Sequence, residues 1–277
     1  MGPVDLHPWN RDFTWQAGAP PYVTLTAEQA AAFDRDGYVV VPGVFDAATV
    51  AEIVADIDRF EAEVDAYLAG RADQRMLIAE AGAITFTTHL VTRSERLAAF
   101  ARHPFFTGVC ADLVGPDVNL YWDQAVYKKP EKPRRFPWHQ DNGYAFVEPQ
   151  QYLTCWVALT DATAENGCPR VARGRHRDGT LAHTYVDPLG FECFSDDDIA
   201  EIDVAEVGAG GVVVFSSLTP HLTGPNVTGE VRKAYILQYA PRGAEVLRGD
   251  PTGEPTERVP ADDPARQFAV LRDGHPV

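Results

Sequence analysis

The chain has 277 residues, of which 45% are hydrophobic and 23% are charged, as in an ordinary soluble globular protein. A chain of this length buries roughly three quarters of its unfolded surface, so a substantial core needs no disulfide or metal staple. The net charge of −16 argues against general binding to nucleic acids or to an anionic membrane surface.

The cysteines and the N-terminus favour a cytoplasmic protein. Cys110, Cys155, Cys168 and Cys193 are scattered without a CxxC pair, and Cys155 lies in an apolar run where a buried free thiol is expected. The opening stretch "MGPVDLHPWNRDFTWQ" lacks the basic and apolar regions of a signal peptide. No segment approaches the roughly 18 uninterrupted apolar residues of a membrane span.

The first third of the chain predicts helices. Residues 1–24 are rich in Pro, Gly and aromatic residues and are expected to form a surface arm. Thr26 and Gln29 form a capping-box pattern that opens a helix, and Gly37 ends it. After a short strand at 38–44, Asp46 caps a second helix, whose apolar face repeats at three- and four-residue intervals: Val50, Ile53, Val54, Ile57 and Phe60.

From residue 119 onward the sequence predicts short strands, namely "NLYWDQAVYKK", "YLTCWVALTD", "GGVVVFSS" and "VRKAYILQYAP". Helices followed by short strands indicate an α+β, mainly β chain whose catalytic half is a sandwich or barrel. We expect a single domain: a helical part at 25–118, a strand-rich core at 119–242 and a tail at 243–277. A long insertion at 178–206 is a natural place for a lid. Its "SDDD" run is read as a helix start capped by Ser195, in preference to a calcium loop.

Two histidines and one carboxylate make up a candidate metal site. His139 and Asp141 lie two residues apart in "RRFPWHQDNGY", so in extended backbone both side chains point to the same face. His221 follows a Thr-Pro turn after an apolar strand, and Arg232 opens the next strand. Two His and one carboxylate form the facial triad that non-haem Fe(II) prefers, whereas zinc sites more often use thiolates or a third His.

Several of these segments, in this order, resemble the phytanoyl-CoA dioxygenase family of Fe(II)- and 2-oxoglutarate-dependent oxygenases. "LTAEQAAAFDRDGYVVVPGVF" resembles its opening helix and strand, and "QAVYKKP" and "PWHQD" resemble its Gln, Lys and HxD segments. "ENGCPRVARGRH" is similar to a turn that usually ends in Pro-Gly-Ser-His, and "PHLTGPN" with Arg232 resembles the distal His and the cosubstrate-binding Arg. The resemblance covers about residues 25–242.

The resemblance implies a fold and a set of site residues. The fold would be a double-stranded β-helix (jelly roll, cupin-like) with the N-terminal helices packed outside. His139, Asp141 and His221 would bind iron, and Arg232 would pair with the distal carboxylate of 2-oxoglutarate. Lys128 and Thr154 fall where the family places further contacts to that carboxylate. Trp156 shares the strand face of Thr154, and Gln124 shares that of Lys128, so both are expected in the pocket.

The implied reaction is hydroxylation of an aliphatic C–H bond of a small organic molecule, with O2 consumed and succinate and CO2 released, in biosynthetic tailoring. Asp141 favours oxygenation over halogenation, because related halogenases carry a small residue at this position. Desaturation, cyclisation or epimerisation with the same cofactors remains open. So do a non-enzymatic jelly-roll binding protein and a zinc hydrolase.

The sequence also departs from the family pattern. Ala172–His176 replaces the usual Pro-Gly-Ser-His, and Ala234 stands where many relatives carry Ser, so Thr154 would have to supply a missing cosubstrate hydrogen bond. His176 and His183 are expected to be surface or lid residues. His89 is expected in a loop with a backbone partner, with the pocket mouth as the alternative.

"KKPEKPRR", at residues 128–135, concentrates five positive charges. It is either a solvated loop or a guide for an anionic substrate. The sequence holds no indication of an oligomeric state.

Overall fold

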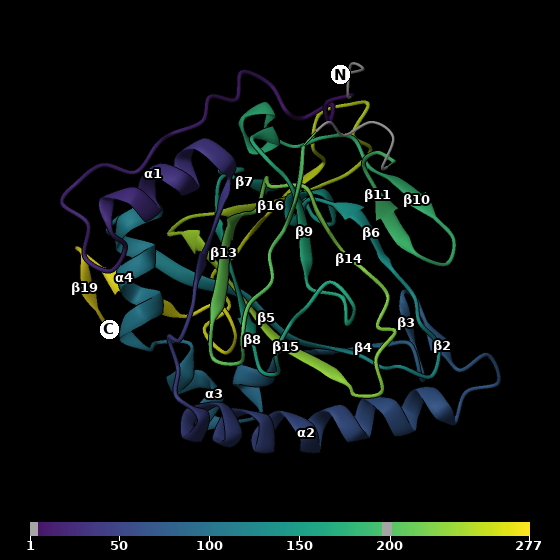
Figure 1. Cartoon of the computed structure of the whole chain (residues 1–277). Coiled ribbons are helices and arrows are strands. Elements are labelled where there is room, and N and C mark those ends of the chain that lie inside the picture. The colour runs from purple at the N-terminus through teal and green to yellow at the C-terminus, as the bar shows by residue number, and fades with distance from the viewer. Residues whose placement is uncertain (1–4, 196–200) are drawn as a thin grey trace.

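A large antiparallel sheet organises the computed structural model, which describes residues 5–195 and 201–277 (Figure 1). Eight of its strands run side by side in the order β1 (Tyr38–Val41), β13 (Val212–Ser216), β8 (Leu153–Ala158), β15 (Arg232–Pro241), β5 (Val118–Lys128), β4 (Ile84–Thr88), β3 (Ala79–Glu80) and β2 (Arg75–Met76). Two more, β18 (Ala269–Arg272) and β19 (His275–Pro276), extend from the start of β5.

A smaller sheet forms the other half of the strand core, in the order β12 (Ile202–Val204), β9 (Pro169–Ala172), β14 (His221–Thr223) and β6 (Phe136–His139). A third sheet contains β17 (Glu257–Pro260), β16 (Glu245–Arg248) and β7 (Val147–Glu148), and β10 (Thr184–Val186) forms a hairpin with β11 (Gly190–Glu192). These sheets form the expected jelly-roll core, so the predicted fold class is confirmed.

The helices pack outside this core, as predicted. They are α1 (Ala27–Asp36), α2 (Ala47–Ala69), α3 (Glu95–Phe100) and α4 (Pro104–Leu113), and Figure 1 shows α2 running along the lower edge of the molecule. The Thr26–Gln29 capping box is present at the start of α1, and Asp46 accepts a hydrogen bond from the Thr49 amide at 2.8 Å at the start of α2. Three residues of the predicted apolar stripe are buried, namely Ile53, Ile57 and Phe60.

Side-chain alternation divides the large sheet into a helix face and a site face. On β8, Leu153, Cys155 and Val157 belong to the core cluster that also contains the helix residues. The intervening residues point the opposite way, because successive residues of a strand alternate faces. Trp156 and Ala158 accordingly pack in a second cluster, together with Phe136 of the smaller sheet. The even-numbered residues of β8 therefore look into the space between the sheets.

The helical part and the expected C-terminal tail both contribute strands to the sheets, which the sequence did not predict. The expected C-terminal tail supplies four strands, and β18 pairs with β5 through Leu271 and Val118. The helical part supplies β1 to β4, and β4 pairs with β5 along its whole length. β5 has open hydrogen-bonding groups on this edge, so segments from both ends of the chain pair with it.

The insertion contains the β10–β11 hairpin and β12. The proposed helix start at "SDDD" lies outside the described residues, which omit 196–200, and movement of the insertion as a lid stays a prediction. Within the described ranges, no helix is both long and apolar enough to cross a lipid bilayer.

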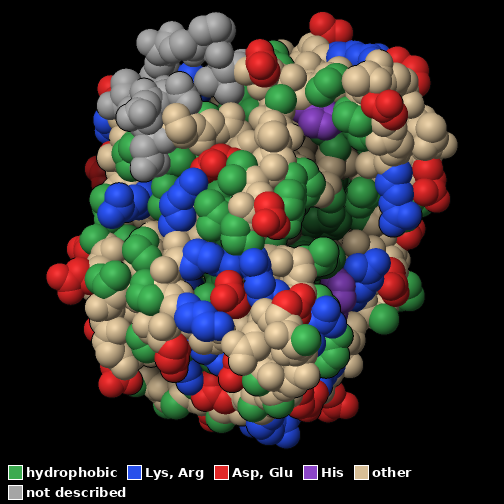
Figure 2. Space-filling model, turned by 90° about the vertical axis from the view of Figure 1, so that its right-hand side faces the viewer, with side chains coloured by type: hydrophobic (Ala, Val, Ile, Leu, Met, Phe, Trp, Pro, Cys, Tyr) green, Lys and Arg blue, Asp and Glu red, His purple; other side chains and the backbone are tan. Residues whose placement is uncertain are grey.

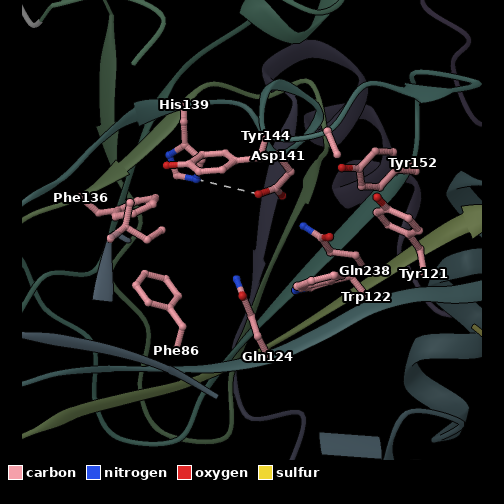
Figure 3. Close-up of a pocket in the computed structure, with 12 residues that line it drawn as sticks. Phe86, Tyr121, Trp122, Gln124, Phe136, His139, Asp141, Tyr144, Tyr152 and Gln238 are labelled. Atoms are coloured by element: carbon pink, nitrogen blue, oxygen red, sulfur yellow. Dashed lines mark ion pairs between the residues drawn. The ribbon is translucent and has the colours of Figure 1, made fainter. Parts of the chain in front are cut away.

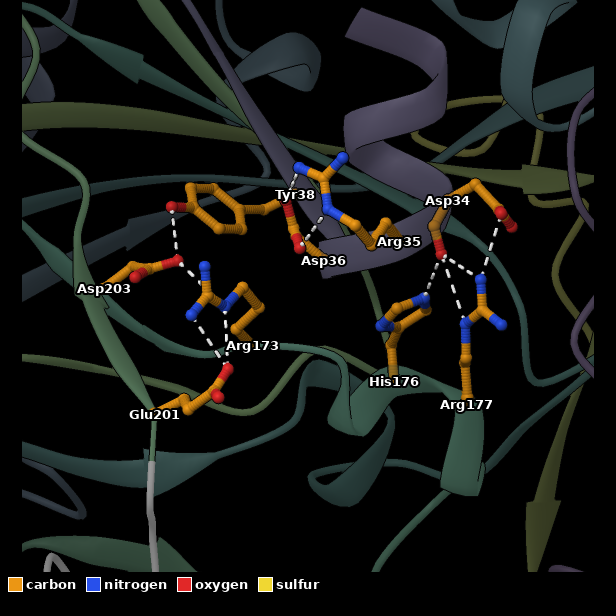
Figure 4. A network of polar contacts seen from close by, with 9 residues as sticks. All are labelled: Asp34, Arg35, Asp36, Tyr38, Arg173, His176, Arg177, Glu201 and Asp203. Atoms are coloured by element: carbon orange, nitrogen blue, oxygen red, sulfur yellow. Dashed lines mark hydrogen bonds and ion pairs between the residues drawn. The ribbon is translucent and has the colours of Figure 1, made fainter. Parts of the chain in front are cut away.

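His176 is buried, so its prediction as a surface or lid residue is wrong. Its ring stands edge-on to Trp15 at 4.4 Å, and its Nε2 lies 3.1 Å from the Asp34 carbonyl oxygen. Figure 4 shows it inside a polar network that joins the end of α1 to the 173–177 turn. In the same network Tyr38 donates to Asp203, and Arg173 pairs with Glu201. His176 and Arg177 therefore connect this turn to Asp34 of α1.

The N-terminal arm is tied down by one buried carboxylate. Asp112 of α4 accepts hydrogen bonds from the backbone amides of Val23, Thr24 and Leu25, at 2.5, 2.9 and 2.8 Å. These bonds hold the residues that lead into α1, so the arm has a fixed position relative to α4.

We expect Asp112→Asn to lower the free energy of unfolding by about 1–3 kcal/mol, because one carboxylate oxygen becomes an amide donor facing a backbone N–H. Urea unfolding followed by circular dichroism measures the change. Asp262→Asn is the matched control, since Asp262 is exposed. Equal stabilities of the two variants would contradict this role of Asp112.

Candidate functional site

The two candidate metal-binding histidines face each other across the smaller sheet. His139 ends β6 and His221 begins β14, and the two residues are Cα partners in the antiparallel ladder between these strands. Their ring centroids lie 4.2 Å apart, and both side chains are almost fully buried. Together with Asp141 they offer three ligand atoms that lie within 4.8 Å of one another. The structure therefore brings the three predicted ligands to one place.

Hydrogen bonds to backbone carbonyls orient both imidazoles so that Nε2 faces the site. Nδ1 of His139 lies 2.9 Å from the Pro137 carbonyl oxygen, and Nδ1 of His221 lies 3.0 Å from that of Thr219. A carbonyl can only accept, so the proton sits on Nδ1 and the Nε2 lone pair faces the site. Burial, followed by the proximity of His221, holds the pKa of His139 well below its usual value. A neutral imidazole is the form that binds a metal.

The backbone at Asp141 differs slightly from the predicted continuous strand. β6 ends at His139, and Asp141 begins the 3-10 turn η2 (Asp141–Gly143). Gln140 between them keeps an extended backbone, so the alternation of side chains persists. The Gln140 side chain points away and is held by three backbone groups: it donates to Gly179 and Leu218 and accepts from Leu181. This anchor fixes the directions of both neighbouring side chains.

Two further bonds stiffen the same segment. The backbone N–H of Gln140 donates to Nε2 of His183 at 2.9 Å, so His183 is a half-buried partner of the site backbone and its second nitrogen is engaged with the Leu181 carbonyl. Thr154 donates its hydroxyl proton to Asp141 Oδ2 at 2.5 Å. The predicted contact of Thr154 with the cosubstrate stays a prediction; in this structure its single hydroxyl proton is directed to the Asp141 carboxylate.

Arg232 is a buried cation with unused hydrogen-bonding capacity. It opens β15 and is 1% exposed, and its Nη1 donates to the Val126 carbonyl at 3.3 Å. Nε and Nη2 have no hydrogen-bond partner among the described residues. Burial lowers the pKa of Arg232 to about 9. An unpaired buried guanidinium is costly, and two free N–H groups on one edge match a carboxylate in bidentate geometry.

One cavity joins this guanidinium to the three ligands. It has a volume of about 50 Å³ and is lined by His139, Asp141, His221, Thr154 and Arg232, among others. Trp156 lies on its wall, with the Arg232 guanidinium carbon 5.1 Å from the indole ring centroid, and Gln124 also borders it. The predicted pocket positions of Trp156 and Gln124 agree with this cavity, which we call the inner cavity.

Lys128 has a different environment from the predicted one. It pairs with Arg232 in the β5–β15 ladder and is equally buried. Its ammonium group donates to the carbonyl oxygens of Arg134, Thr223 and Gly224, at 3.0, 2.9 and 2.5 Å. These bonds use all three protons, so a contact with a cosubstrate carboxylate would require one of them to break. The structure thus gives Lys128 the position of a clamp between β5, the 128–135 loop and β14.

The remaining charges of the 128–135 loop are also paired. Lys129 contacts Glu61 and Asp65 at 3.0 and 2.7 Å. Arg134 contacts Glu80 at 2.9 Å, Lys132 contacts the same carboxylate at 3.4 Å, and Arg135 contacts Glu192 at 2.6 Å. The loop therefore presents compensated charge and ties β3 and β11 to the core.

A second, larger cavity lies on the other side of the ligands (Figure 3). This outer cavity has a volume of about 270 Å³ and shares His139, Asp141 and Gln124 with the inner one. Its wall is mainly aromatic: Phe86, Tyr121, Trp122, Phe136, Tyr144 and Tyr152. His89 packs on Trp122 at 4.4 Å, and its backbone N–H donates to the Asp123 carbonyl, as expected for a loop residue.

A β-bulge brings two aromatic residues of this wall, Tyr121 and Trp122, into the cavity, and the sequence does not predict it. Gln238 pairs with Trp122 and the next residue of β15 pairs with Leu120, so Tyr121 is an extra residue in the ladder. The bulge lets the adjacent residues Tyr121 and Trp122 both line the cavity, against the simple alternation of a strand. Gln238 itself was detectable, since it lies six residues after Arg232 and therefore on the same face.

Comparisons with known proteins place this site in a family. The sequence model described as phytanoyl-CoA dioxygenase (PhyH) matches residues 33–234. An ectoine dioxygenase from Sphingopyxis alaskensis is 28% identical over 280 aligned residues, which cover 89% of this chain and 89% of that protein.

Two solved structures share the fold. The epimerase SnoN, in complex with Fe3+, alpha ketoglutarate and nogalamycin RO, aligns with a TM-score of 0.65 at 24% identity, over 84% of this chain and 94% of SnoN. The carbocyclase SnoK from nogalamycin biosynthesis aligns with a TM-score of 0.67 at 22% identity, over 86% of this chain and 97% of SnoK. With the family match extending over most of its length, the chain belongs to the phytanoyl-CoA dioxygenase family of iron- and 2-oxoglutarate-dependent oxygenases.

Proposed function

We propose that this enzyme hydroxylates an aliphatic C–H bond of a small organic molecule in a biosynthetic tailoring step, with 2-oxoglutarate and O2 as cosubstrates. The substrate gains one oxygen atom from O2, and 2-oxoglutarate takes the other and leaves as succinate and CO2. The observation that carries the proposal is the inner cavity, where an unpaired buried guanidinium and three metal-binding side chains line one space. The free thiols favour a reducing location such as the cytoplasm.

His139, Asp141 and His221 would hold Fe(II), which supplies the oxidising chemistry when bound. The donor set fits this ion, with two neutral imidazoles, one carboxylate and no thiolate among the three. The protein's own part is to fix these ligands through Gln140 and Thr154, and to seat the cosubstrate carboxylate on Arg232. Aromatic side chains on the outer side exclude water from the C–H bond that reacts.

The proposal predicts a visible charge-transfer band when Fe(II) and 2-oxoglutarate are added to the protein under nitrogen. His139→Ala should abolish the band, because it removes one of three ligands. His275→Ala is the matched control, since His275 is exposed. A folded wild-type protein without the band would instead favour the binding-protein or zinc-hydrolase alternative. With a substrate in hand, the mass of the product separates hydroxylation from desaturation, cyclisation or epimerisation.

Arg232→Lys should raise the Kd for 2-oxoglutarate roughly tenfold or more, because a charge-assisted bidentate contact worth about 1.5–3 kcal/mol becomes a single contact. Titration of the charge-transfer band measures this Kd. Arg242→Lys, on the exposed surface, should leave it unchanged. Fe(II) affinity without 2-oxoglutarate should be equal in all three proteins; a parallel loss of metal binding would place Arg232 in a different role.

Thr154→Val keeps the side-chain shape but removes the proton donated to Asp141. We expect metal affinity to fall about 10–100-fold, the usual effect of losing a hydrogen bond to a metal ligand, and Thr154→Ser to restore it. Mn(II) binding followed by electron paramagnetic resonance provides the readout. A fall in 2-oxoglutarate affinity with unchanged metal affinity would return Thr154 to the cosubstrate contact first expected for it.

A further inference from the structure

The outer cavity has no positive charge on its wall. Among the described residues that line it, the ionisable groups are His139, Asp141 and tyrosines, and no Lys or Arg is present. The cations near its rim are engaged in ion pairs away from the wall: Arg135 pairs with Glu192, and Arg134 pairs with Glu80, a carboxylate that Lys132 and Arg75 also contact. Arg266, behind Tyr121, pairs with Asp263 at 3.0 Å. A carboxylate or phosphate in this cavity would lose its water without gaining a counter-ion from the protein, which disfavours its binding.

One wall of the cavity instead offers neutral hydrogen-bonding groups. Figure 3 shows Tyr121, Tyr152, Trp122 and Gln238 together on one side, with Gln124 below the candidate ligands. The side chains of these five residues form no hydrogen bond with any described residue. Burial raises the pKa of Tyr121 to about 12 and also raises the pKa of Tyr152, so both phenols stay protonated and can donate. Two phenols, an indole and two amides make this wall rich in neutral hydrogen-bonding groups: all five can donate, and the phenols and amides can also accept.

The opposite wall is apolar. Phe86 of β4 and Phe136 of β6 lie with ring centroids 5.7 Å apart, and Tyr144 stacks on Phe136 at 6.1 Å with an interplanar angle of 17°. Ile78 completes this side from the β2–β3 hairpin. Hydrophobic side chains also line the hollow that Figure 2 shows on this face of the molecule. Such a surface suits the flat face of a ring, because aromatic pairs favour stacked and edge-to-face contacts.

We infer that the substrate is an uncharged, ring-bearing molecule with carbonyl, amide or hydroxyl groups along one edge. Its ring face would lie on the Phe86–Phe136 wall and its acceptor edge on the Tyr121–Gln238 wall, which brings a C–H bond next to the candidate iron site. An anion lacks a counter-ion there. A cation lacks a free counter-ion as well, because Asp141, the carboxylate on the described part of the wall, is engaged by Thr154 and belongs to the candidate metal site. This inference rests on the proposed function for the reaction, but the cavity's preference can be measured without it.

The test uses three probes on one frame that differ in charge: 4-methylbenzamide, 4-methylbenzoate and 4-methylbenzylammonium. Each is titrated into the full chain by saturation-transfer NMR, first without metal and then with Fe(II) and 2-oxoglutarate under nitrogen. We expect the neutral amide to bind about tenfold more tightly than either charged probe, the scale set by an uncompensated charge in a desolvated site. Ala145→Phe fills the cavity and should abolish amide binding, whereas Val227→Phe, at an exposed position, should not.

Two variants at one position then test the wall itself. Gln238→Leu should weaken amide binding several-fold by removing a hydrogen-bonding group. Gln238→Lys supplies the missing cation and should reverse the order of amide and benzoate. The inference is overturned if benzoate or the ammonium probe binds the wild type as tightly as the amide, or if the amide does not bind. If the charge-transfer band is normal but the three probes bind in a different order of affinity, only this inference is contradicted. If the probes bind in the expected order of affinity but the band is absent, only the proposed function is contradicted.

Discussion

The antiparallel pairing of β6 with β14 is the constraint on which the site depends. It places His139 directly opposite His221, although these residues are far apart in the sequence. A slip of one residue in this register would turn one imidazole to the other face of the sheet. Gln140 prevents such a slip, because its side-chain amide is hydrogen-bonded to three backbone groups on the far side. Metal binding therefore needs no rearrangement of the backbone, only small movements of three side chains that already converge.

The inner and outer cavities differ in whether a buried positive charge lines them. Lys128 and Arg232 are neighbours in the β5–β15 ladder and equally buried. Carbonyl oxygens accept every proton of the lysine ammonium, whereas two nitrogens of the arginine have no hydrogen-bond partner within the described part of the chain. The inner cavity is thus prepared for an anion of fixed geometry, and the outer one is bounded by neutral groups. Such a division lets one site hold a dicarboxylate on one side of the metal ligands and an uncharged molecule on the other.

Local signals in the sequence were sufficient for α1, α2 and the main strands of the large sheet, and for naming the candidate metal-site residues. The Thr26–Gln29 capping box and the stripe around Ile57 depend on neighbours within one or two helical turns, and the structure confirms both. His139, Asp141, His221 and Arg232 were recognisable because residue type and chain order suffice to identify such a set. His176 was misjudged, since its burial depends on Trp15 and Asp34, far away in the chain. The hydrogen-bond partners of Thr154 and Lys128 could not be predicted from the sequence either. The period of a strand tells which face a side chain is on, but not which atom of another segment lies opposite it.

The sequence by itself predicted α1, α2, β1 and four strands of the large sheet (β5, β8, β13 and β15), and it identified four side chains that the structure brings to one cavity. Only the tertiary structure decided how charges are paired. The sequence shows the 128–135 loop as a run of positive charges, and the fold supplies its acidic partners Glu61, Glu80 and Glu192 from three other segments. It also decided the shape of the outer cavity, where a bulge at Tyr121 turns two adjacent aromatic residues inward. The physical reason is range. Periodicity and capping act between residues a few positions apart, whereas ion pairing, burial and sheet register depend on which distant segments the fold brings together.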